Sequence, residues 1–190
     1  MEELQQEIEN SINALKAGKV ILYPTDTIWG LGVDATNSKA VQKIYNIKKR
    51  NPHNSLIILL DSMEKLKDYV EDVPEISYDL IEKTRVPLTI IYTKAKNLAK
   101  NVIAGDGSIA IRVVNDEFCS EVIRQFGKPI VATSANISGG APPVVFNDIS
   151  EDIIQKADYV VKIFRDKINT LKPSTIIKMG DDGMFEIVRE

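Results

Sequence analysis

The sequence predicts an α/β protein, a sheet covered by helices, and two observations support this class. Segments with apolar residues at helical spacing alternate along the chain with short apolar runs of strand length. The composition is ordinary for a folded protein, with 44% hydrophobic and 27% charged residues. A chain of 190 residues can bury a substantial core, so we expect one domain over residues 1–190. Whether the strands run parallel or in mixed order is not determined by this pattern.

The N-terminal half is expected to alternate helix and strand from its first residues. Apolar residues recur at helical spacing from Leu4 to Leu15, and Gly18 closes the segment, which predicts a helix over residues 3–17. Residues 19–23 read as a strand, and a helix over 39–50 is expected between a cap at Asn37 or Ser38 and a stop at Pro52. The run 56–60 is the longest apolar one, so we expect it to be a buried central strand; it is far too short to span a membrane.

The rest of the chain continues the same alternation. Further expected elements are short helices within 62–72 and 74–84, strands at 88–92 and 108–114, a helix at 117–126, a strand at 129–132, a helix at 149–156, and strands at 159–163, 175–178 and 185–188.

Charge and cysteine content exclude several classes of protein. The net charge of −3 argues against a surface built for non-specific nucleic-acid binding, which depends on many contacts from Lys and Arg to phosphate. Cys119 is the only cysteine, so no disulfide framework and no cysteine cluster for a metal is expected. The acidic N-terminus, MEELQQEIEN, lacks the basic and apolar regions of a secretory signal, and we expect a cytoplasmic protein.

The stretch ILYPTDTIWGLG, residues 21–32, is unusual for the end of a core strand. Its apolar start leads into Pro24, two threonines, an aspartate, the only tryptophan and two glycines. We interpret it as one wall of a pocket for a small polar substrate.

Lys48 extends an apolar helix face. It lies seven residues after Val41 and four after Ile44, so it continues their inward stripe and either reaches into a cleft or extends to solvent. Cations such as Lys48 and Arg50 also favour a helix C-terminus for simple electrostatic reasons, and this alternative stays open.

Two further segments place small or charged residues beside a strand. Alternation puts Ser108, Ala110 and Arg112 on one face of the strand at 108–114, which is either a small cationic pocket face or a solvent-facing edge. TSANISGG, residues 133–140, follows an apolar strand and would let a ligand approach the backbone, although a plain turn has the same composition. KPSTII repeats the theme, with Ser174 where a loop enters a strand.

No familiar cofactor motif is present. The sequence lacks a G-x-x-x-x-G-K-[ST] loop, and GLGVDA lacks the third glycine of a dinucleotide fingerprint. His53 is the only histidine and is expected to be an exposed loop residue. The candidate site therefore consists of Lys, Arg, Ser, Thr and Asn, which bind carboxylates and phosphates and stabilise negative charge.

Taken in order, these motifs resemble the YrdC family. YPTDTIWGLG, KKR with the following proline, SLIILL, PLT, IAIRV, PIVATSANISG and PSTII occur in the family's order, from about Gly18 to Arg189. The K-x-R and S-x-N signature falls on Lys48, Arg50, Ser134 and Asn136, and these four are the expected catalytic residues. The intact S-x-N is unlike the YciO branch, in which this motif is typically degraded.

The resemblance implies a fold and an activity. The implied fold is a twisted, mixed sheet flanked by helices around a deep electropositive cleft, in the short single-domain form. The implied activity is that of an L-threonylcarbamoyladenylate synthase, a nucleotidyltransferase that condenses L-threonine, bicarbonate and ATP with Mg²⁺ and releases pyrophosphate. Its product serves the threonylcarbamoyladenosine modification of tRNA, so tRNA or downstream modification proteins are expected partners.

The resemblance also assigns residue roles. L-Threonine would contact Thr25, Arg112 and Ser174, with the Arg112 guanidinium as the natural partner of the carboxylate. ATP would be surrounded by Lys48, Arg50, Pro52, Ser108, Ser134, Pro142 and Arg189. No metal-ligating residue is identified.

Two loops depart from the family pattern, and two other functions remain open. Residues 84–87 replace a Trp-Pro-Gly-Pro turn, and RDKINTLK at 165–172 replaces an aspartate- and glycine-containing loop, which bears on ATP affinity. One alternative is an RNA- or nucleotide-binding module without synthase activity, although few aromatic residues are present for stacking. Another is an ATP-dependent enzyme with a different acceptor, such as serine or a related acid.

Overall fold

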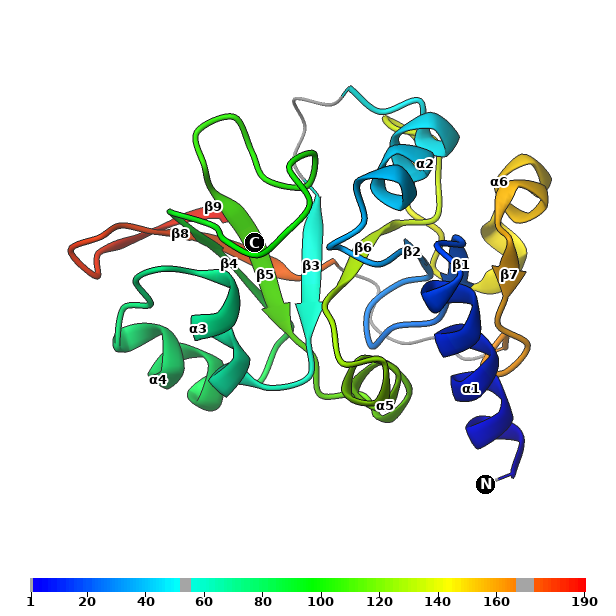
Figure 1. Cartoon of the computed structure of the whole chain (residues 1–190), viewed down its shortest axis with the longest axis horizontal. Helices are drawn as coiled ribbons and strands as arrows, with labels where there is room; N and C mark the ends of the chain where they lie inside the picture. Colours follow the sequence, from blue (N-terminus) through cyan, green and yellow to red (C-terminus); the bar gives the residue numbers. More distant parts are fainter. Residues whose placement is uncertain (1, 52–55, 167–172) are drawn as a thin grey trace.

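The computed structural model describes residues 2–51, 56–166 and 173–190. Its framework is one nine-stranded mixed sheet in the order β7-β1-β2-β6-β3-β5-β4-β8-β9 (Figure 1). The strands are β1 Ile21–Tyr23, β2 Gly30–Gly32, β3 Ile57–Leu60, β4 Leu88–Tyr92, β5 Ile109–Val113, β6 Ile130–Ser134, β7 Tyr159–Val160, β8 Thr175–Met179 and β9 Phe185–Arg189.

Helices cover the sheet as the alternating pattern predicts. They are α1 Glu2–Lys16, α2 Ser38–Lys48, α3 Leu66–Tyr69, α4 Ile76–Lys83, α5 Glu117–Phe126 and α6 Glu151–Lys156, with 3₁₀ turns at Met63–Lys65 and Phe146–Asp148. In Figure 1, α1 and α5 lie together below the sheet, while α2 and α6 lie at the upper right. No helix in the described parts of the chain is long and apolar enough to cross a membrane.

β3 is the centre of the sheet, as its apolar run predicts. It pairs in parallel with β5 and antiparallel with β6, and Ile58, Leu59 and Leu60 are fully buried. β5 lies between β3 and β4. The alternative that residues 108–114 form a solvent-facing edge is therefore wrong.

Helix α2 ends where the chain enters the left-handed region. Asn37 caps its start by accepting hydrogen bonds from the N–H groups of Lys39 and Ala40, as expected. Lys49 has φ of 48°, so the helix ends at Lys48, two residues before the predicted limit. The predicted stop at Pro52 lies outside the described residues.

The strand β2 was not predicted from the sequence. Gly30–Gly32 has no β-branched residue, yet it pairs with both β1 and β6. A Cβ on Gly32 would lie 2.7 Å from Cε1 of Tyr23 and 3.1 Å from the carbonyl oxygen of Val131. The glycine is required by this close approach of neighbouring strands, a tertiary condition that periodicity does not report.

Other predicted boundaries shift with tertiary pairing. β6 extends to Ser134 because Ser134 and Thr133 pair with Gly30 and Leu31, so the first residues of TSANISGG are strand and not a plain turn. β7 has two residues where 159–163 was predicted, because its partner β1 ends just before Pro24, which has no N–H to donate.

Candidate functional site

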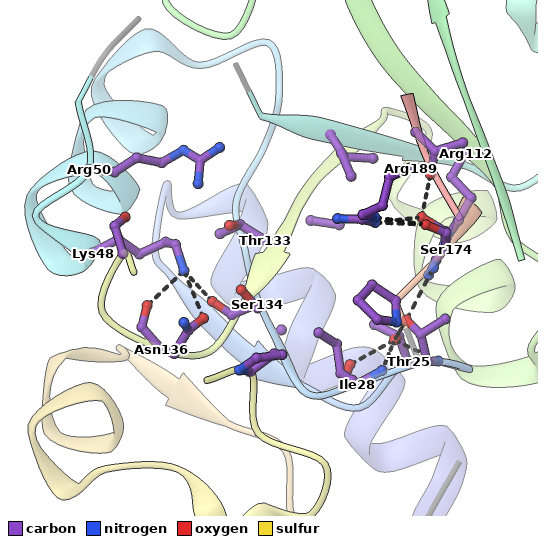
Figure 2. Close-up of a pocket in the computed structure, with 18 of the residues that line it drawn as sticks. Thr25, Ile28, Lys48, Arg50, Arg112, Thr133, Ser134, Asn136, Ser174 and Arg189 are labelled. Carbon is purple, nitrogen blue, oxygen red and sulfur yellow. Dashed lines mark hydrogen bonds between the residues drawn. The ribbon is translucent and has the colours of Figure 1, made fainter. Parts of the chain in front are cut away.

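A cavity of about 320 Å³ lies between the sheet and the C-terminal end of α2 (Figure 2). It is lined by Thr25, Thr27, Ile28, Gly30, Lys48, Arg50, Ile57, Leu59, Thr89, Arg112, Ala132, Thr133, Ser134, Asn136, Ser138, Gly139, Gly140, Pro142, Pro173, Ser174 and Arg189. Four of these side chains are cations, and none of the described lining residues is a carboxylate. The volume is in the range of small-molecule sites.

Strand register builds the floor of the cavity. Arg112 pairs with Leu59, and Ile57 pairs with Ala132, so these side chains share one face of three adjacent strands. Ser134 lies two residues beyond Ala132 on the same face. The sheet thus brings Arg112 and the S-x-N segment to one surface although they are distant in sequence.

The opening stretch forms a wall of the cavity, as predicted, through a tight local turn. The Thr25 hydroxyl accepts hydrogen bonds from the N–H groups of Thr27 and Ile28, at 3.1 and 3.2 Å, and donates to the Ile28 carbonyl oxygen at 2.7 Å. Such side-chain to backbone bonds compete with regular structure and stabilise turns. Thr25 is buried, so its hydroxyl first shapes the backbone that faces the cavity.

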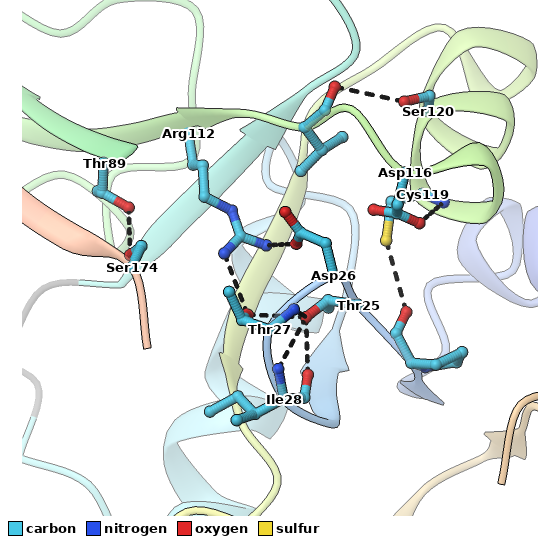
Figure 3. Close-up of polar contacts among 12 residues, drawn as sticks. Thr25, Asp26, Thr27, Ile28, Thr89, Arg112, Asp116, Cys119, Ser120 and Ser174 are labelled. Atoms are coloured by element: carbon cyan, nitrogen blue, oxygen red, sulfur yellow. Dashed lines mark hydrogen bonds and ion pairs between the residues drawn. The ribbon is translucent and has the colours of Figure 1, made fainter. Parts of the chain in front are cut away.

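Arg112 is held in place by this same turn. Its Nη2 lies 2.8 Å from Asp26 Oδ1, and its Nη1 donates to Thr27 Oγ1 at 3.1 Å (Figure 3). The hydroxyl oxygens of Thr25 and Thr27 lie 2.9 Å apart, which links the Arg112 contact to the turn. Arg112 Nε is buried without a hydrogen-bond partner among the described residues. Nη1 and Nη2 carry two N–H groups each, and each nitrogen has one hydrogen-bond partner among the described residues, so the guanidinium retains donors for a ligand.

Lys48 lines the cavity, so of the two alternatives left open by its helical position the cleft is the one observed, but its hydrogen bonds go to the protein. Its ammonium donates to the carbonyl oxygens of Ser134 and Asn136 and, at 3.3 Å, to Asn136 Oδ1 (Figure 2). In return, the Lys48 carbonyl oxygen accepts the Ser138 N–H at 3.0 Å. Lys48 is buried, with 1% of its surface exposed. Its hydrogen bonds connect the end of α2 to residues 134–140, which we call the S-x-N loop.

Burial lowers the basicity of the cations at this end. Desolvation, and then the nearby charge of Arg50, lower the pKa of Lys48 from 10.5 to about 8. Burial likewise lowers the pKa of Arg50. An anion entering here would restore favourable surroundings for both charges.

Thr89, Ser174 and Arg189 form a second cluster of polar side chains, on the side of the cavity away from Lys48. Ser174 Oγ lies 2.7 Å from Thr89 Oγ1, and Arg189 donates through Nη2 to the Ser174 carbonyl oxygen at 2.7 Å. Burial, and then the charge of Arg112, lower the pKa of Arg189. The positive charges of Arg112 and Arg189 therefore repel each other across this side of the cavity.

The structure brings together nine of the predicted site residues. The cavity is lined by Thr25, Lys48, Arg50, Arg112, Ser134, Asn136, Pro142, Ser174 and Arg189. Pro52 lies outside the described residues, as do His53 and most of the loop at 165–172.

Ser108 is not at the cavity. It precedes β5, and its hydroxyl donates to Asp106 Oδ1 at 2.6 Å in a local turn. Alternation along the predicted strand at 108–114 would put Ser108 on the Arg112 face, but the strand begins only at Ile109, and Ser108 is bonded into the preceding loop.

Two contributing residues were missed by sequence reasoning. Thr89 lines the cavity from β4, and Asp26 anchors Arg112. The signal for Thr89 was available, because it is the one aliphatic hydroxyl in the apolar strand LTIIY. Asp26 gave no periodic signal.

The described part of the chain builds no metal site from protein ligands. The described residues contain no group of three or more His, Cys, Asp or Glu side chains that could hold an ion. Since Mg²⁺ prefers oxygen ligands and is commonly held by substrate phosphates with few protein groups, the donor set here offers it no dedicated cage.

Fold and cavity together define a class: an α/β protein with a cation-lined cleft on one face of a mixed sheet, suited to anionic ligands. The chain belongs to the Sua5/YciO/YrdC family, whose model, described as "Telomere recombination", matches residues 13–190.

Individual relatives agree with this membership. A putative threonylcarbamoyl-AMP synthase of Methanocaldococcus jannaschii is 35% identical over 189 residues, covering 98% of this chain and 84% of the relative. A threonylcarbamoyl-AMP synthase of Vibrio parahaemolyticus is 31% identical over 184 residues, covering 90% and 98%.

Solved structures show the same fold. Sua5 of Pyrococcus abyssi complexed with L-threonine has a TM-score of 0.82 and 29% identity, covering 90% of this chain and 50% of that one. Escherichia coli YciO has a TM-score of 0.84 over 98% of this chain and 89% of that one, and at 22% identity it supports the fold alone. The expected twisted mixed α/β architecture is confirmed.

Proposed function

We propose that the protein is an enzyme, an L-threonylcarbamoyladenylate synthase that condenses L-threonine, bicarbonate and ATP and releases pyrophosphate. The observation that carries the proposal is the convergence of Thr25, Arg112 and Ser174 with the K-x-R and S-x-N residues in one cavity. The names of the relatives and the threonine-bound Sua5 structure support the same substrate and product class.

The chemistry suits a cation-lined site. The amine of L-threonine and bicarbonate give a carbamate and water, and a carbamate oxygen then attacks the α-phosphorus of ATP, which expels pyrophosphate. Several anions must lie together, and fixed cations that are already positioned stabilise them without reorganisation. Lys48, Arg50, Arg112 and Arg189 supply that charge, which supports an electropositive cleft.

The two ends of the cavity take different parts of the reaction. The turn at Thr25, with Arg112 and Ser174, holds the amino acid, and the guanidinium offers donors to its carboxylate. The end of α2 and the S-x-N loop hold the phosphates, with Arg50 and Ser134 nearest to them. Mg²⁺ would come with the nucleotide and neutralise its phosphates, held by phosphate oxygens and water.

Pyrophosphate release tests the proposal directly. We expect release from ATP only when L-threonine and bicarbonate are both present, with the adenylate detected by mass. Arg50→Ala should remove most of this release, because loss of one charge-stabilising donor typically raises a barrier by about 3–4 kcal/mol. Release that is independent of L-threonine would contradict the proposal.

The same assay addresses the alternatives. Replacing L-threonine with L-serine tests a different acceptor. RNA binding without threonine-dependent turnover would favour the binding module. The product's use in tRNA modification, and any downstream partner, are part of the proposal.

A further inference from the structure

Thr89 and Ser174 form a hydroxyl pair at the edge of the cavity. Their oxygens are 2.7 Å apart (Figure 3). Thr89 lies on β4, and Ser174 immediately precedes the neighbouring strand β8, whose register sets Leu88 beside Thr175. Thr89 is fully buried, whereas Ser174 keeps 4% of its surface and lines the cavity together with Thr89.

The surroundings decide which hydroxyl donates. Among the described residues, the Thr89 hydroxyl has Ser174 Oγ as its hydrogen-bond partner. A buried O–H without an acceptor costs free energy, so the Thr89 proton must be donated to Ser174. Arg189 Nη2, a donor under all conditions, also lies 3.4 Å from Ser174 Oγ (Figure 2 shows this arginine beside the serine).

Ser174 Oγ therefore accepts hydrogen bonds from Thr89 and Arg189, and its own hydroxyl proton has no acceptor in this pair of contacts. A hydroxyl has one donor hydrogen and two acceptor lone pairs, and both lone pairs are occupied here. Ser174 can only donate toward the cavity.

We propose that Thr89 is a positioning residue that fixes Ser174 as a hydrogen-bond donor to the carboxylate of the amino-acid substrate. This inference rests on the proposed function. The carboxylate, and not the ammonium, is the matching group, because Arg112 and Arg189 flank Ser174 with positive charge. If the amino acid bound in the opposite orientation, its ammonium would face three hydrogen-bond donors, those of Ser174, Arg112 and Arg189.

Comparing L-threonine with L-threoninamide as substrates tests whether the Ser174 hydroxyl is fixed as a donor or can also accept a hydrogen bond. The amide replaces one carboxylate oxygen with a donor group, and the change in charge affects wild type and variant equally. In Thr89→Val, which keeps the shape, Ser174 regains a free lone pair and can accept from the amide. We expect the kcat/KM preference for L-threonine over the amide to fall about threefold to tenfold, mainly through KM.

Thr89→Ser is the matched control, because it keeps the donor and should retain the wild-type preference. A folded Thr89→Val with an unchanged preference would overturn the inference, as would an equal loss in Thr89→Ser. If Thr89→Val does not fold, Ser174→Ala replaces it: the preference should fall by a similar factor, and an unchanged preference would overturn the inference.

Calorimetric binding of the two compounds separates this inference from the proposed function. Wild-type turnover of L-threonine with an unchanged preference in Thr89→Val would overturn the inference alone. A changed binding preference without adenylate formation would support the inference while the proposed reaction fails. A wild type that binds neither compound would overturn both.

Discussion

At the scale of the residue, Lys48 has a more specific role than its position in the sequence suggests. Its three donor hydrogens match the three protein oxygens within reach, two from backbone carbonyls and one from Asn136. Asn136 in turn donates to the Gly140 carbonyl oxygen at 2.6 Å, so the loop is bonded across its own width. The charge of Lys48 therefore shapes the loop that presents Ser134.

Lys48→Met and Asn136→Ala should act as one unit. Each is expected to lower threonine-dependent pyrophosphate release by about 100-fold, because either change releases the loop. The double variant should lose far less than the product of the two effects, since residues that share a network are not additive.

Lys43→Met is the control for this cycle. Lys43 lies on the exposed side of α2, where its ammonium donates to the Gly18 carbonyl oxygen away from the cavity, and its loss should leave turnover unchanged. Multiplicative losses in the double variant would show that Lys48 and Asn136 act independently.

The depressed pKa of Lys48 predicts a pH dependence. With a pKa of about 8 in the fold against 10.5 ordinarily, Lys48 loses its proton in the native state first. Between about pH 8 and pH 10.5 the unfolded chain binds more protons at Lys48 than the folded chain does, so the Lys48 contribution to the free energy of unfolding rises with pH in this window. Over the same range the folded protein loses the ammonium charge that holds the S-x-N loop. ATP affinity should therefore weaken as pH rises through about 8.

Titration of ATP binding without L-threonine measures this effect and avoids the ionisation of the substrate amine. In Lys48→Met, the affinity should be low and flat over the same range. An equal decline in the variant would assign the pH dependence to another group.

At the scale of the element, β2 depends on having no side chain at its end. Gly32→Ala should lower the free energy of unfolding by about 1–3 kcal/mol, because its Cβ would meet the Tyr23 ring and a backbone carbonyl that cannot both move. Urea unfolding measures the change. Gly105→Ala is the matched control, with nothing within 4 Å of the added Cβ, and equal stability losses would refute the explanation.

Element boundaries show where local signals suffice. The helix at Glu117–Phe126 and the strand at Leu88–Tyr92 match the predicted ranges, because apolar spacing and local caps define them. β2, the extension of β6 and the shortness of β7 depend on partner strands, so a window of sequence cannot locate them.

At the scale of the whole molecule, the cavity joins segments from Thr25 to Arg189, so ligand binding should stabilise the whole fold. Saturation at 100 times Kd adds about 2.7 kcal/mol, which corresponds to a rise in Tm of roughly 5–10 °C for a chain of this size. Thermal unfolding with ATP and L-threonine should show this rise. L-Leucine in place of L-threonine should not add to the effect of ATP, and an equal shift would contradict selective binding.

The sequence by itself determined the α/β class, the central strand, the position of Lys48 on the apolar stripe of its helix and a pocket wall within residues 21–32, because each depends on local periodicity or on a turn. The ordered motifs also named nine of the residues that line the cavity. Tertiary structure decided which polar groups share hydrogen bonds: Asp26 with Arg112, Thr89 with Ser174, and Lys48 with the S-x-N loop. It also decided that the Ser108 hydroxyl bonds to Asp106 in a local turn and does not line the cavity. These outcomes depend on strand register and on competition for single protons between residues far apart in sequence, and neither is encoded in any local pattern.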